Sequence, residues 1–320
     1  MPVGRLKNNH LTHFVTHITR RSIKHALLLS SIIVLWYLRQ EADQWHTGES
    51  RMSSLNKMLG IMTLFSDQKF AWTIEEMEAR LSLPRSTLYR YLRELVDAEF
   101  LTSLPEMGYT LGPKIIELES IVQRQDPLIT ASRPLMKELV AEFGGVAALC
   151  RNYRQKVLCV HQEQGADGFR SGYLKGQSRP LLMGSASRVI FAHLPNQMVA
   201  KLFDDHADAF RLAGLGSDIE AVRQSLKTIR QRGWDVTIGQ VTSGVTGVAA
   251  PIFDGRENVA GSLSVVLRRT DLSEERLSVI ADKTTFCARA ITRALSDSGE
   301  EESNPNVRPG RSLSRLIPTI

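Results

Sequence analysis

The segment that runs from Thr73 to Leu111 constrains the fold of this chain more than any other part of it. The spacing of its apolar and turn-forming residues predicts five consecutive elements: a helix over 74–81, a turn at 82–84, a helix from 85 to about 98, and strands over 101–104 and 109–111. That order is the order of a winged helix-turn-helix, a module that places its second helix in the major groove of DNA. The segment therefore predicts a nucleic-acid partner.

The second of these helices divides into two faces. Spacings of three and four residues place an apolar stripe toward a core, formed by Leu88, Leu92, Leu95 and Val96. The other side carries cationic and hydroxyl side chains that can reach phosphates and base edges: Arg85, Ser86, Thr87, Tyr89, Arg90 and Arg93. The alternative is an ordinary solvated helix face, which the neighbouring turn and wing make the weaker interpretation.

Positive charge is distributed unevenly along the chain and is not concentrated in the expected DNA-binding module. The chain has 320 residues, enough for two domains and a tail, and carries a net charge of +6 with a pI near 9.3. Residues 1–51 contain seven Lys or Arg and three Asp or Glu, which gives a net charge of +4. Residues 52–125 contain eight Lys or Arg and ten Asp or Glu, which gives a net charge of −2. The prediction therefore depends on the cluster on one helix face and not on the global charge.

The first 51 residues are atypical and contain five of the eight histidines. An apolar run over 26–38 has basic neighbours, but its 13 residues fall short of the roughly 20 that a membrane-spanning helix needs. It resembles the core of a signal peptide, although no convincing cleavage site follows it. Because Met52 opens the expected first helix of the DNA-binding module, we interpret 1–51 as upstream codons read as protein. A membrane tether and a genuine soluble extension are the alternatives.

The three cysteines, Cys150, Cys159 and Cys287, lie far apart and form no C-x-x-C pair. No histidine stands at ligand spacing beside them, so we expect no metal site and no cofactor. Buried free thiols in a reducing cytoplasm are the simplest interpretation. A redox role or a ligand contact for Cys150 or Cys159 is the alternative.

A connector over 113–126 is expected to be an amphipathic helix that joins the winged helix-turn-helix, residues 52–112, to a second domain. Its apolar positions form one stripe: Ile115, Ile116, Leu118, Ile121 and Val122. A helix this apolar outside a domain core needs a partner, and a second copy of the chain is the simplest one. The pattern therefore predicts a homodimer or a tetramer.

The second domain, residues 127–296, alternates element types and predicts an α+β sandwich. Helices are expected over 131–143, 185–193, 218–233 and 273–294. Strands are expected over 146–149, 157–161, 245–253 and 259–267, the last two joined by a hairpin turn at Asp254-Gly255. Residues 297–320 are rich in Ser, Glu, Pro, Gly and Arg and are expected to be disordered.

Patterns typical of enzymes are weak in this sequence. The segment 184–187 (GSAS) departs from the Gly-x-Ser-x-Gly elbow of hydrolases, and no glycine-rich phosphate loop occurs. His161 and Glu163 could carry out acid–base chemistry, but His161 is placed at the end of a strand, where it is more often a boundary residue. We therefore expect no catalytic residues.

The chain resembles the IclR family of bacterial transcriptional regulators over about residues 54–295. The resemblance is carried by 83–90 (LPRSTLYR), 109–113 (YTLGP), the segment 179–192 and 247–252 (GVAAPI). It implies an N-terminal winged helix, a helical linker and a C-terminal GAF-like α/β domain that binds a small effector. Proteins of this family are dimers, or dimers of dimers, that bind palindromic operators.

Two pairs of residues depart from the family pattern. The family usually has Gly-Lys where this chain has Ser187-Arg188, and Gly-Glu where this chain has Gly239-Gln240. A glutamine in place of a glutamate removes a negative charge and adds amide donors. The effector of this chain is therefore expected to differ from those of other family members, or to be recognised differently.

The resemblance also implies where an effector would bind. Ser185 and Ala186 would open a helix whose N–H groups favour an anion, and Thr237, Gly247 and Ser264 align with pocket positions, with Tyr173 and Cys159 as further walls. An organic or aromatic acid would suit such a site. Structurally, Ser185 could instead be a simple helix cap, and the others ordinary sheet residues.

The sequence thus predicts a cytoplasmic DNA-binding regulator whose operator affinity responds to a small molecule. The alternatives are a membrane-tethered DNA-binding sensor that uses 26–38, and an enzyme-like effector domain that turns over its ligand.

Overall fold

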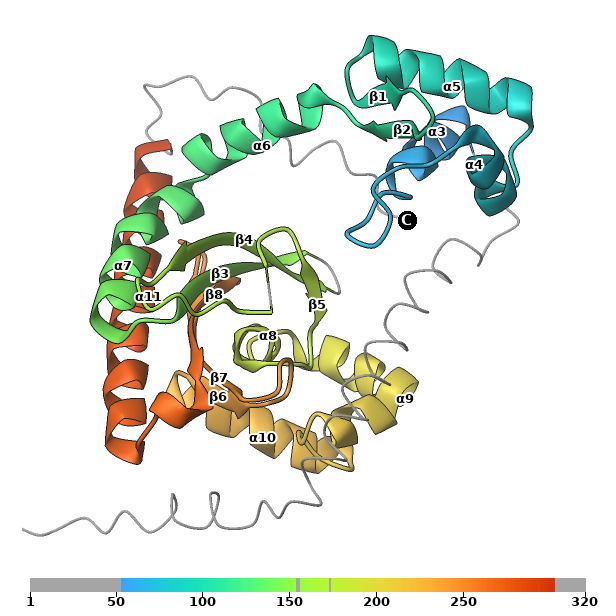
Figure 1. The fold of residues 1–320 in the computed structure, drawn as a ribbon. Helices are drawn as coiled ribbons and strands as arrows, with labels where there is room; N and C mark the ends of the chain where they lie inside the picture. Colours follow the sequence, from blue (N-terminus) through green and yellow to red (C-terminus); the bar gives the residue numbers. More distant parts are fainter. Residues whose placement is uncertain (1–52, 154–155, 173, 303–320) are drawn as a thin grey trace, which may run out of the picture. The chain divides into compact units, whose positions relative to one another are not determined.

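The computed structural model describes residues 53–302 except 154, 155 and 173 (Figure 1). The described residues form two compact units, which meet in the sequence between Asp126 and Pro127. Residues 1–52, with the apolar run over 26–38, and residues 303–320 lie outside the described part of the chain. Every helix within 53–302 is too short or too polar to cross a membrane.

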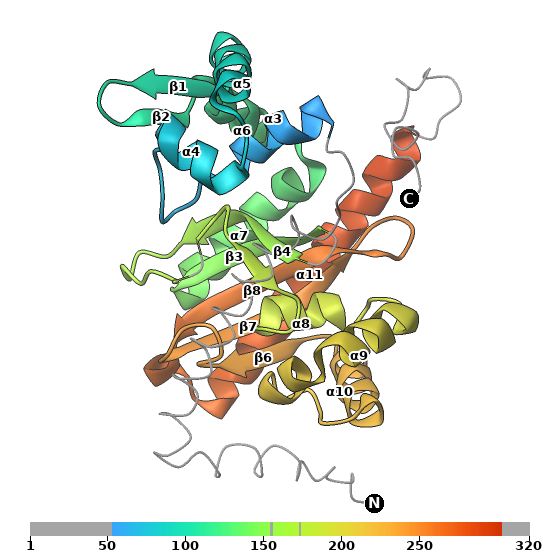
Figure 2. The same cartoon turned by 90° about the vertical axis from the view of Figure 1, so that its right-hand side faces the viewer.

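The first unit contains the expected helix-turn-helix and wing (Figure 2). Its elements are α3 (Ser54–Met62), α4 (Ile74–Leu81), α5 (Arg85–Asp97), β1 (Leu101–Leu104), β2 (Gly108–Leu111) and α6 (Pro113–Gln125). The predicted helices over 74–81 and from 85 are confirmed, and the second wing strand begins one residue earlier than expected. The strands of the wing are antiparallel, with Leu101 opposite Leu111.

Local hydrogen bonds fix where α4 begins and ends. The Glu76 backbone N–H donates to the Thr73 hydroxyl at 3.3 Å, and the Thr73 N–H donates to the Glu76 carboxylate at 3.0 Å. This reciprocal capping box satisfies two donors that the first turn leaves without intrahelical acceptors. Ser82 adopts a left-handed conformation, φ 52°, which ends the helix and starts the turn into α5.

The core of the first unit gathers around α5. Its fully buried members include Ile61, Met77, Leu88, Leu92 and Leu101. The apolar side chains of Leu55 and Leu59 on α3 point away from this core and are 67% and 57% exposed. Because Ile61 faces the core, Leu59 and Leu55, two and six positions before it, point to the other side of the helix.

The wing is held at its exit by a close backbone approach. A Cβ atom at Gly112 would lie 2.2 Å from the carbonyl oxygen of Glu99, so a side chain cannot be placed there without moving the backbone. The Gly112 N–H donates to the Phe100 carbonyl at 2.8 Å, and the Lys114 N–H donates to the Glu99 carbonyl at 3.1 Å. The start of α6 is therefore tied to the residues that follow α5.

Helix α6 is the predicted connector, and within its own unit its apolar stripe stays in solvent. Ile116 is 72% exposed, and Leu118, Ile121 and Val122 are between 42% and 48% exposed. None of the residues of α6 has its side chain buried. The helix thus has an apolar face without a core to cover it.

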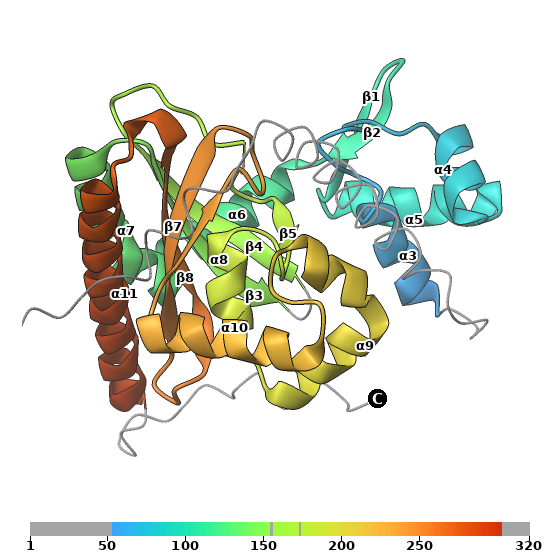
Figure 3. The ribbon, with the colours of Figure 1, turned by 90° about the horizontal axis from the view of Figure 1, so that it is seen from below.

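The second unit is a six-stranded antiparallel sheet between two layers of helices (Figures 1 and 3). The strand order is β5-β4-β3-β8-β7-β6. The strands are β3 (Val146–Tyr153), β4 (Lys156–Gln164), β5 (Ser178–Pro180), β6 (Asp235–Ile238), β7 (Val245–Phe253) and β8 (Val259–Arg268). The helices are α7 (Pro127–Phe143), α8 (Ser185–Phe191), α9 (Asn196–Leu212), α10 (Ile219–Arg232) and α11 (Glu274–Glu302), with the 3-10 turn η1 (Arg269–Asp271) before α11.

Alternation along the central strands builds one apolar core on each face of the sheet. Leu149 and Val248 pack with α7 and α11 in one core, whereas Ala148 and Ala249 pack with α8, α9 and α10 in the other. Successive side chains of a strand point to opposite faces, so neighbouring residues serve different cores. The predicted α+β class with a GAF-like second domain is confirmed.

Several elements differ from the expectation. Strands β5 and β6 and helix α9 were not predicted, since β5 and β6 have three and four residues and α9 is kinked at His206. Helix α7 begins earlier than expected, at Pro127. Strand β3 continues to Tyr153, and strand β4 begins at Lys156. Helix α11 continues to Glu302, through the first residues of the segment expected to be disordered.

Candidate nucleic-acid interface and ligand cavity

The outer face of α5 presents the expected DNA-contacting residues to solvent. Arg85, Ser86, Tyr89, Arg90 and Arg93 are exposed, and Thr87 is half-buried. The inner face buries Leu88, Tyr91, Leu92 and Leu95. The sequence analysis did not assign Tyr91 to the core. It did assign Val96 to the core, but the Val96 side chain is only half-buried.

The three arginines of this face differ in their surroundings. Arg85 forms an ion pair with Glu75 of α4, and Arg93 lies 3.7 Å from Asp97 one turn further along α5. Arg90 stacks over the Tyr91 ring at 5.1 Å, and no carboxylate of the described residues pairs with it. Exposed ion pairs of this kind contribute little to stability, so phosphates can replace the carboxylates.

A cavity in the second unit brings together five of the seven residues expected to bind an effector. Ser185 and Ala186 of α8, Thr237 of β6, Gly247 of β7 and Ser264 of β8 all line it. The remaining walls include Ser171, Met183, Ser187, Gln240, Val241, Thr242, Val245 and Val266. Not one of the lining residues carries a charge.

The other two expected residues do not join this group. Tyr173 lies outside the described residues. Cys159 is fully buried in β4, opposite Cys150 of β3, and is not part of the cavity wall. All three cysteines are buried free thiols, as expected, and burial raises the pKa of the Cys287 thiol to about 11.

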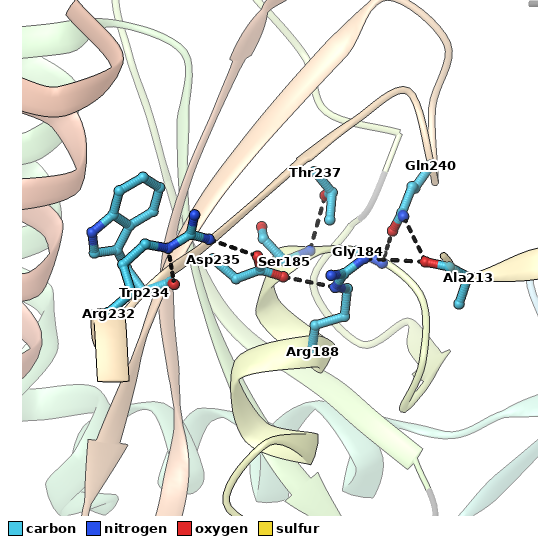
Figure 4. A network of polar contacts seen from close by, with 9 residues as sticks. All are labelled: Gly184, Ser185, Arg188, Ala213, Arg232, Trp234, Asp235, Thr237 and Gln240. Atoms are coloured by element: carbon cyan, nitrogen blue, oxygen red, sulfur yellow. Dashed lines mark hydrogen bonds and ion pairs between the residues drawn. The ribbon is translucent and has the colours of Figure 1, made fainter. Parts of the chain in front are cut away.

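The start of α8 is already capped by side chains (Figure 4). The Ser185 N–H donates to the Thr237 hydroxyl at 3.0 Å, and the Gly184 N–H donates to the Gln240 side-chain oxygen at 3.2 Å. The expectation that the Ser185 amide is free for an anion is therefore wrong, whereas the Ala186 amide has no acceptor among the described residues. Because α8 has only seven residues, its dipole adds little.

The cavity is narrow. Its free volume of about 60 Å³ holds a few water-sized groups. A Cβ atom at Gly247 would lie 2.9 Å from the Ser185 hydroxyl, so glycine keeps this wall open. The Ser264 hydroxyl donates to the Ala148 carbonyl at 3.2 Å and is thereby held by the sheet.

Gln240 makes use of both ends of its amide. Its oxygen accepts from the Gly184 N–H, and its nitrogen donates to the Ala213 carbonyl at 3.1 Å. A carboxylate could only accept, so a glutamate here would face the Ala213 carbonyl without a proton to share. The departure from the family pattern at this position thus has a defined structural role.

A buried ion network lies beside the start of α8 (Figure 4). The Asp235 carboxylate contacts the Arg188 guanidinium at 2.7 Å and the Arg232 guanidinium at 2.9 Å. Arg188 also donates to the Ala213 carbonyl at 3.1 Å, and it is not among the residues that line the cavity. Burial raises the pKa of Asp235, and the two guanidinium groups oppose that change.

His161 and Glu163 form a contact of 3.0 Å on β4 and take no part in the cavity. Strand β4 continues to Gln164, so the placement of His161 at a strand end was wrong. Within residues 53–302, no group of three or more His, Cys, Asp or Glu side chains is arranged to hold a metal ion.

Comparison with known proteins agrees with this architecture. The family described as "IclR helix-turn-helix domain" matches residues 54–105, and "Bacterial transcriptional regulator IclR C-terminal" matches residues 120–293. The HTH-type transcriptional regulator KipR of Bacillus subtilis (strain 168) is 22% identical over 251 residues, which are 77% of this chain and 98% of KipR.

Solved structures share the fold. An IclR transcriptional regulator from Alicyclobacillus acidocaldarius is 20% identical and aligns with a TM-score of 0.66 over 76% of this chain and 99% of its own. An IclR homolog from Microbacterium hydrocarbonoxydans, complexed with 4-hydroxybenzoate, is 20% identical and aligns with a TM-score of 0.62 over 77% of this chain and 100% of its own.

A helix-turn-helix unit and a separate unit with a ligand cavity define a DNA-binding transcriptional regulator with an effector domain. The chain belongs to the IclR family of bacterial transcriptional regulators, because the match to the C-terminal family domain alone, residues 120–293, covers more than half of its 320 residues.

Replacing Asp235 by alanine should strongly destabilise the second unit. The change leaves Arg188 and Arg232 without their shared carboxylate, and breaking a buried ion pair in this way costs about 3–5 kcal/mol. Urea unfolding followed by tryptophan fluorescence measures the loss. The control is Asp208→Ala, which breaks an exposed pair with Arg211 and should cost less than about 1 kcal/mol. Equal losses for the two variants would show that the network is not structural.

Proposed function

We propose that this regulator binds a palindromic operator as a homodimer, or as a tetramer built from such dimers, and that a small organic acid in the second unit controls its affinity. The observation that carries the proposal is the co-occurrence of an exposed, arginine-bearing α5 with a cavity of uncharged polar groups in a separate unit. In this proposal residues 52–112 read DNA, 127–296 sense the effector and 113–126 connect them.

On α5, we assign Ser86, Tyr89 and Arg90 to the bases and Arg85 and Arg93 to phosphates. The N-terminal half of a recognition helix usually contacts base edges. Arg90 supports its assignment because its guanidinium has no carboxylate partner among the described residues, whereas Arg85 and Arg93 each have one. Thr87, half-buried, would flank the contacts of its neighbours.

The chemistry of the cavity supports a small acid as effector. Serine and threonine hydroxyls and the Ala186 amide would hold a carboxylate through hydrogen bonds, without a buried counter-charge. One structural relative was solved with 4-hydroxybenzoate, which is a molecule of this class. Because the free volume of about 60 Å³ is smaller than such a ligand, binding has to widen the walls near Gln240 and Thr242.

The exposed stripe of α6 supports the dimer. Ile116, Leu118, Ile121 and Val122 are apolar and exposed, so a second α6 would bury them. Two paired linkers would set the distance between the two copies of α5, as half-sites about 34–36 Å apart require. A protein that acts on DNA works in the cytoplasm, and we propose that it binds its effector without chemical conversion.

Replacing Arg90 by alanine should weaken operator binding by about 1–3 kcal/mol and relax the preference at one position per half-site. Replacing Arg93 by alanine should weaken binding to all sequences alike and flatten the salt dependence by about one unit of slope. Fluorescence anisotropy with operator and random duplexes at several salt concentrations separates the two effects. If Arg90→Ala reduced the affinity for both duplexes equally, its assignment to a base would be wrong.

A panel of organic and aromatic acids should include one that raises the melting temperature, since a ligand at 100 times its Kd adds about 2.7 kcal/mol. Gly247→Ala should abolish this shift, because the added methyl group points at Ser185 across the cavity. The matched control is Gly255→Ala, whose methyl group would meet Ser296 at an ordinary distance of 3.5 Å. A shift that survives in Gly247→Ala would place the effector elsewhere, and loss of ligand after incubation would reveal turnover.

Replacing both Leu118 and Ile121 by glutamate should weaken operator binding and its response to effector, because charged side chains on the α6 stripe prevent pairing of two linkers. Typical coupling between two sites is about 1–3 kcal/mol, which sets the largest expected change in response. Anisotropy with and without effector measures both quantities, and the effector shift in melting temperature should persist. Wild-type affinity and wild-type response in the double variant would mean that the linker is a passive tether.

A further inference from the structure

The second unit has another cavity, which the effector proposal does not use. It is lined by residues from the end of α10, strand β7 and helix α11, and by His193 just after α8. Its volume of about 360 Å³ falls within the range of small-molecule sites. Its walls include His193, Arg230, Phe253, Thr285, Arg289 and Arg293.

The walls of this second cavity are strongly cationic. Arg230 comes from α10, and Arg289 and Arg293 lie one turn apart on α11. No lining residue is acidic, and no carboxylate of the described residues forms an ion pair with any of the three. All three are exposed, and like charges one turn apart on a helix repel each other weakly, so an anion between them would stabilise the arrangement.

Polar groups without full partners accompany the arginines. The Thr285 hydroxyl is buried and has no hydrogen-bond partner, so turning it toward a ligand costs no existing bond. By contrast, the Thr292 hydroxyl accepts from the Phe253 N–H and donates to the Ala288 carbonyl. Arg230 uses one donor, to the Ala192 carbonyl at 2.6 Å, and keeps the others.

His193 reports the electrostatic character of the site. Its Nδ1 lies 2.8 Å from the Val189 carbonyl, which fixes the proton there in the neutral ring and leaves Nε2 as an acceptor. Burial lowers the pKa of His193 below its ordinary value, and the charge of Arg230 lowers it further. Both effects favour the neutral ring, so the positive charge of the cavity comes from the arginines.

We propose that this cavity binds a small multivalent oxyanion, such as a phosphate monoester or a polycarboxylate, through Arg230, Arg289, Arg293 and the Thr285 hydroxyl. Guanidinium groups bind both kinds of anion through paired hydrogen bonds. A solvated helix face would explain two arginines on α11, but not a third from α10 across a hollow with an unsatisfied hydroxyl. The concave shape favours a small ligand over the backbone of a nucleic acid.

Isothermal titration calorimetry of the full chain tests this site with inorganic phosphate, glycerol 3-phosphate and citrate as probes, and with acetate as a monovalent reference. Saturable binding of at least one multivalent probe is expected, and the stronger of glycerol 3-phosphate and citrate identifies the class. The double variant Arg289→Gln/Arg293→Gln should bind at least about tenfold more weakly. The control, Arg211→Gln, removes one exposed arginine from α9 and should bind as the wild type does.

The variant Thr285→Val distinguishes a specific binding site from a surface that attracts anions by charge alone. It keeps the charge and the shape and removes a hydroxyl that has no partner, so the melting temperature should stay unchanged while probe affinity falls severalfold. Absence of saturable binding by every multivalent probe would overturn the proposal. Wild-type probe affinity in both Arg289→Gln/Arg293→Gln and Thr285→Val would also overturn it. The same holds if these variants lose affinity only for random duplex DNA. Because citrate is also an organic acid, Gly247→Ala, which narrows the effector cavity, serves as a further control, and it should leave probe binding to the basic cavity unchanged.

Discussion

The carboxylate of Asp235 links three elements of the effector unit. It joins β6, α8 and α10 by holding the guanidinium groups of Arg188 and Arg232 in a buried place. Helix α8 has seven residues, too few to be stable by itself, so its position on the sheet comes from such contacts. Thr237 lies two residues after Asp235 on the same face of β6 and caps the first turn of α8. One face of a four-residue strand therefore both anchors the helix and forms part of the ligand cavity.

Elements with local signals could be predicted from the sequence, whereas elements defined by distant contacts could not. Helix α10 has an Asp218 cap at its start and Gly233, at φ 77°, after its end, and the β7–β8 hairpin has a recognisable turn at Asp254. Strand β6 lacks such signals, because it has only four residues and the Arg188 side chain that pairs with its Asp235 lies far away in the sequence. The exposed Leu55 and Leu59 show a related limit, since apolar residues at helical spacing do not by themselves tell which side of α3 is buried.

The two cavities differ in how many of their lining residues could be predicted from the sequence. Five of the residues that family resemblance assigned to an effector line one cavity, but the resemblance did not show that Thr237 occupies the Ser185 amide. The basic cavity has no sequence signal at all. Arg230 and Arg289 each look like ordinary solvent-facing helix residues, and only the packing of α10 and α11 around β7 brings them to one hollow. Each cavity adjoins one end of α8, with Ser185 at the first and His193 just beyond the other.

The junction at Gly112 has a mechanical consequence. Hydrogen bonds from Gly112 and Lys114 to the residues after α5 make the start of α6 continuous with the DNA-reading unit. The 13 residues of α6 span about 20 Å, so the helix acts as a lever arm attached to the wing. A tilt of about 10° at one end displaces the other by roughly 3.5 Å, which is close to the rise of one base pair along DNA. If α5 reads a half-site as proposed, a change of angle small enough to leave both units internally intact is sufficient to shift α5 out of register with it.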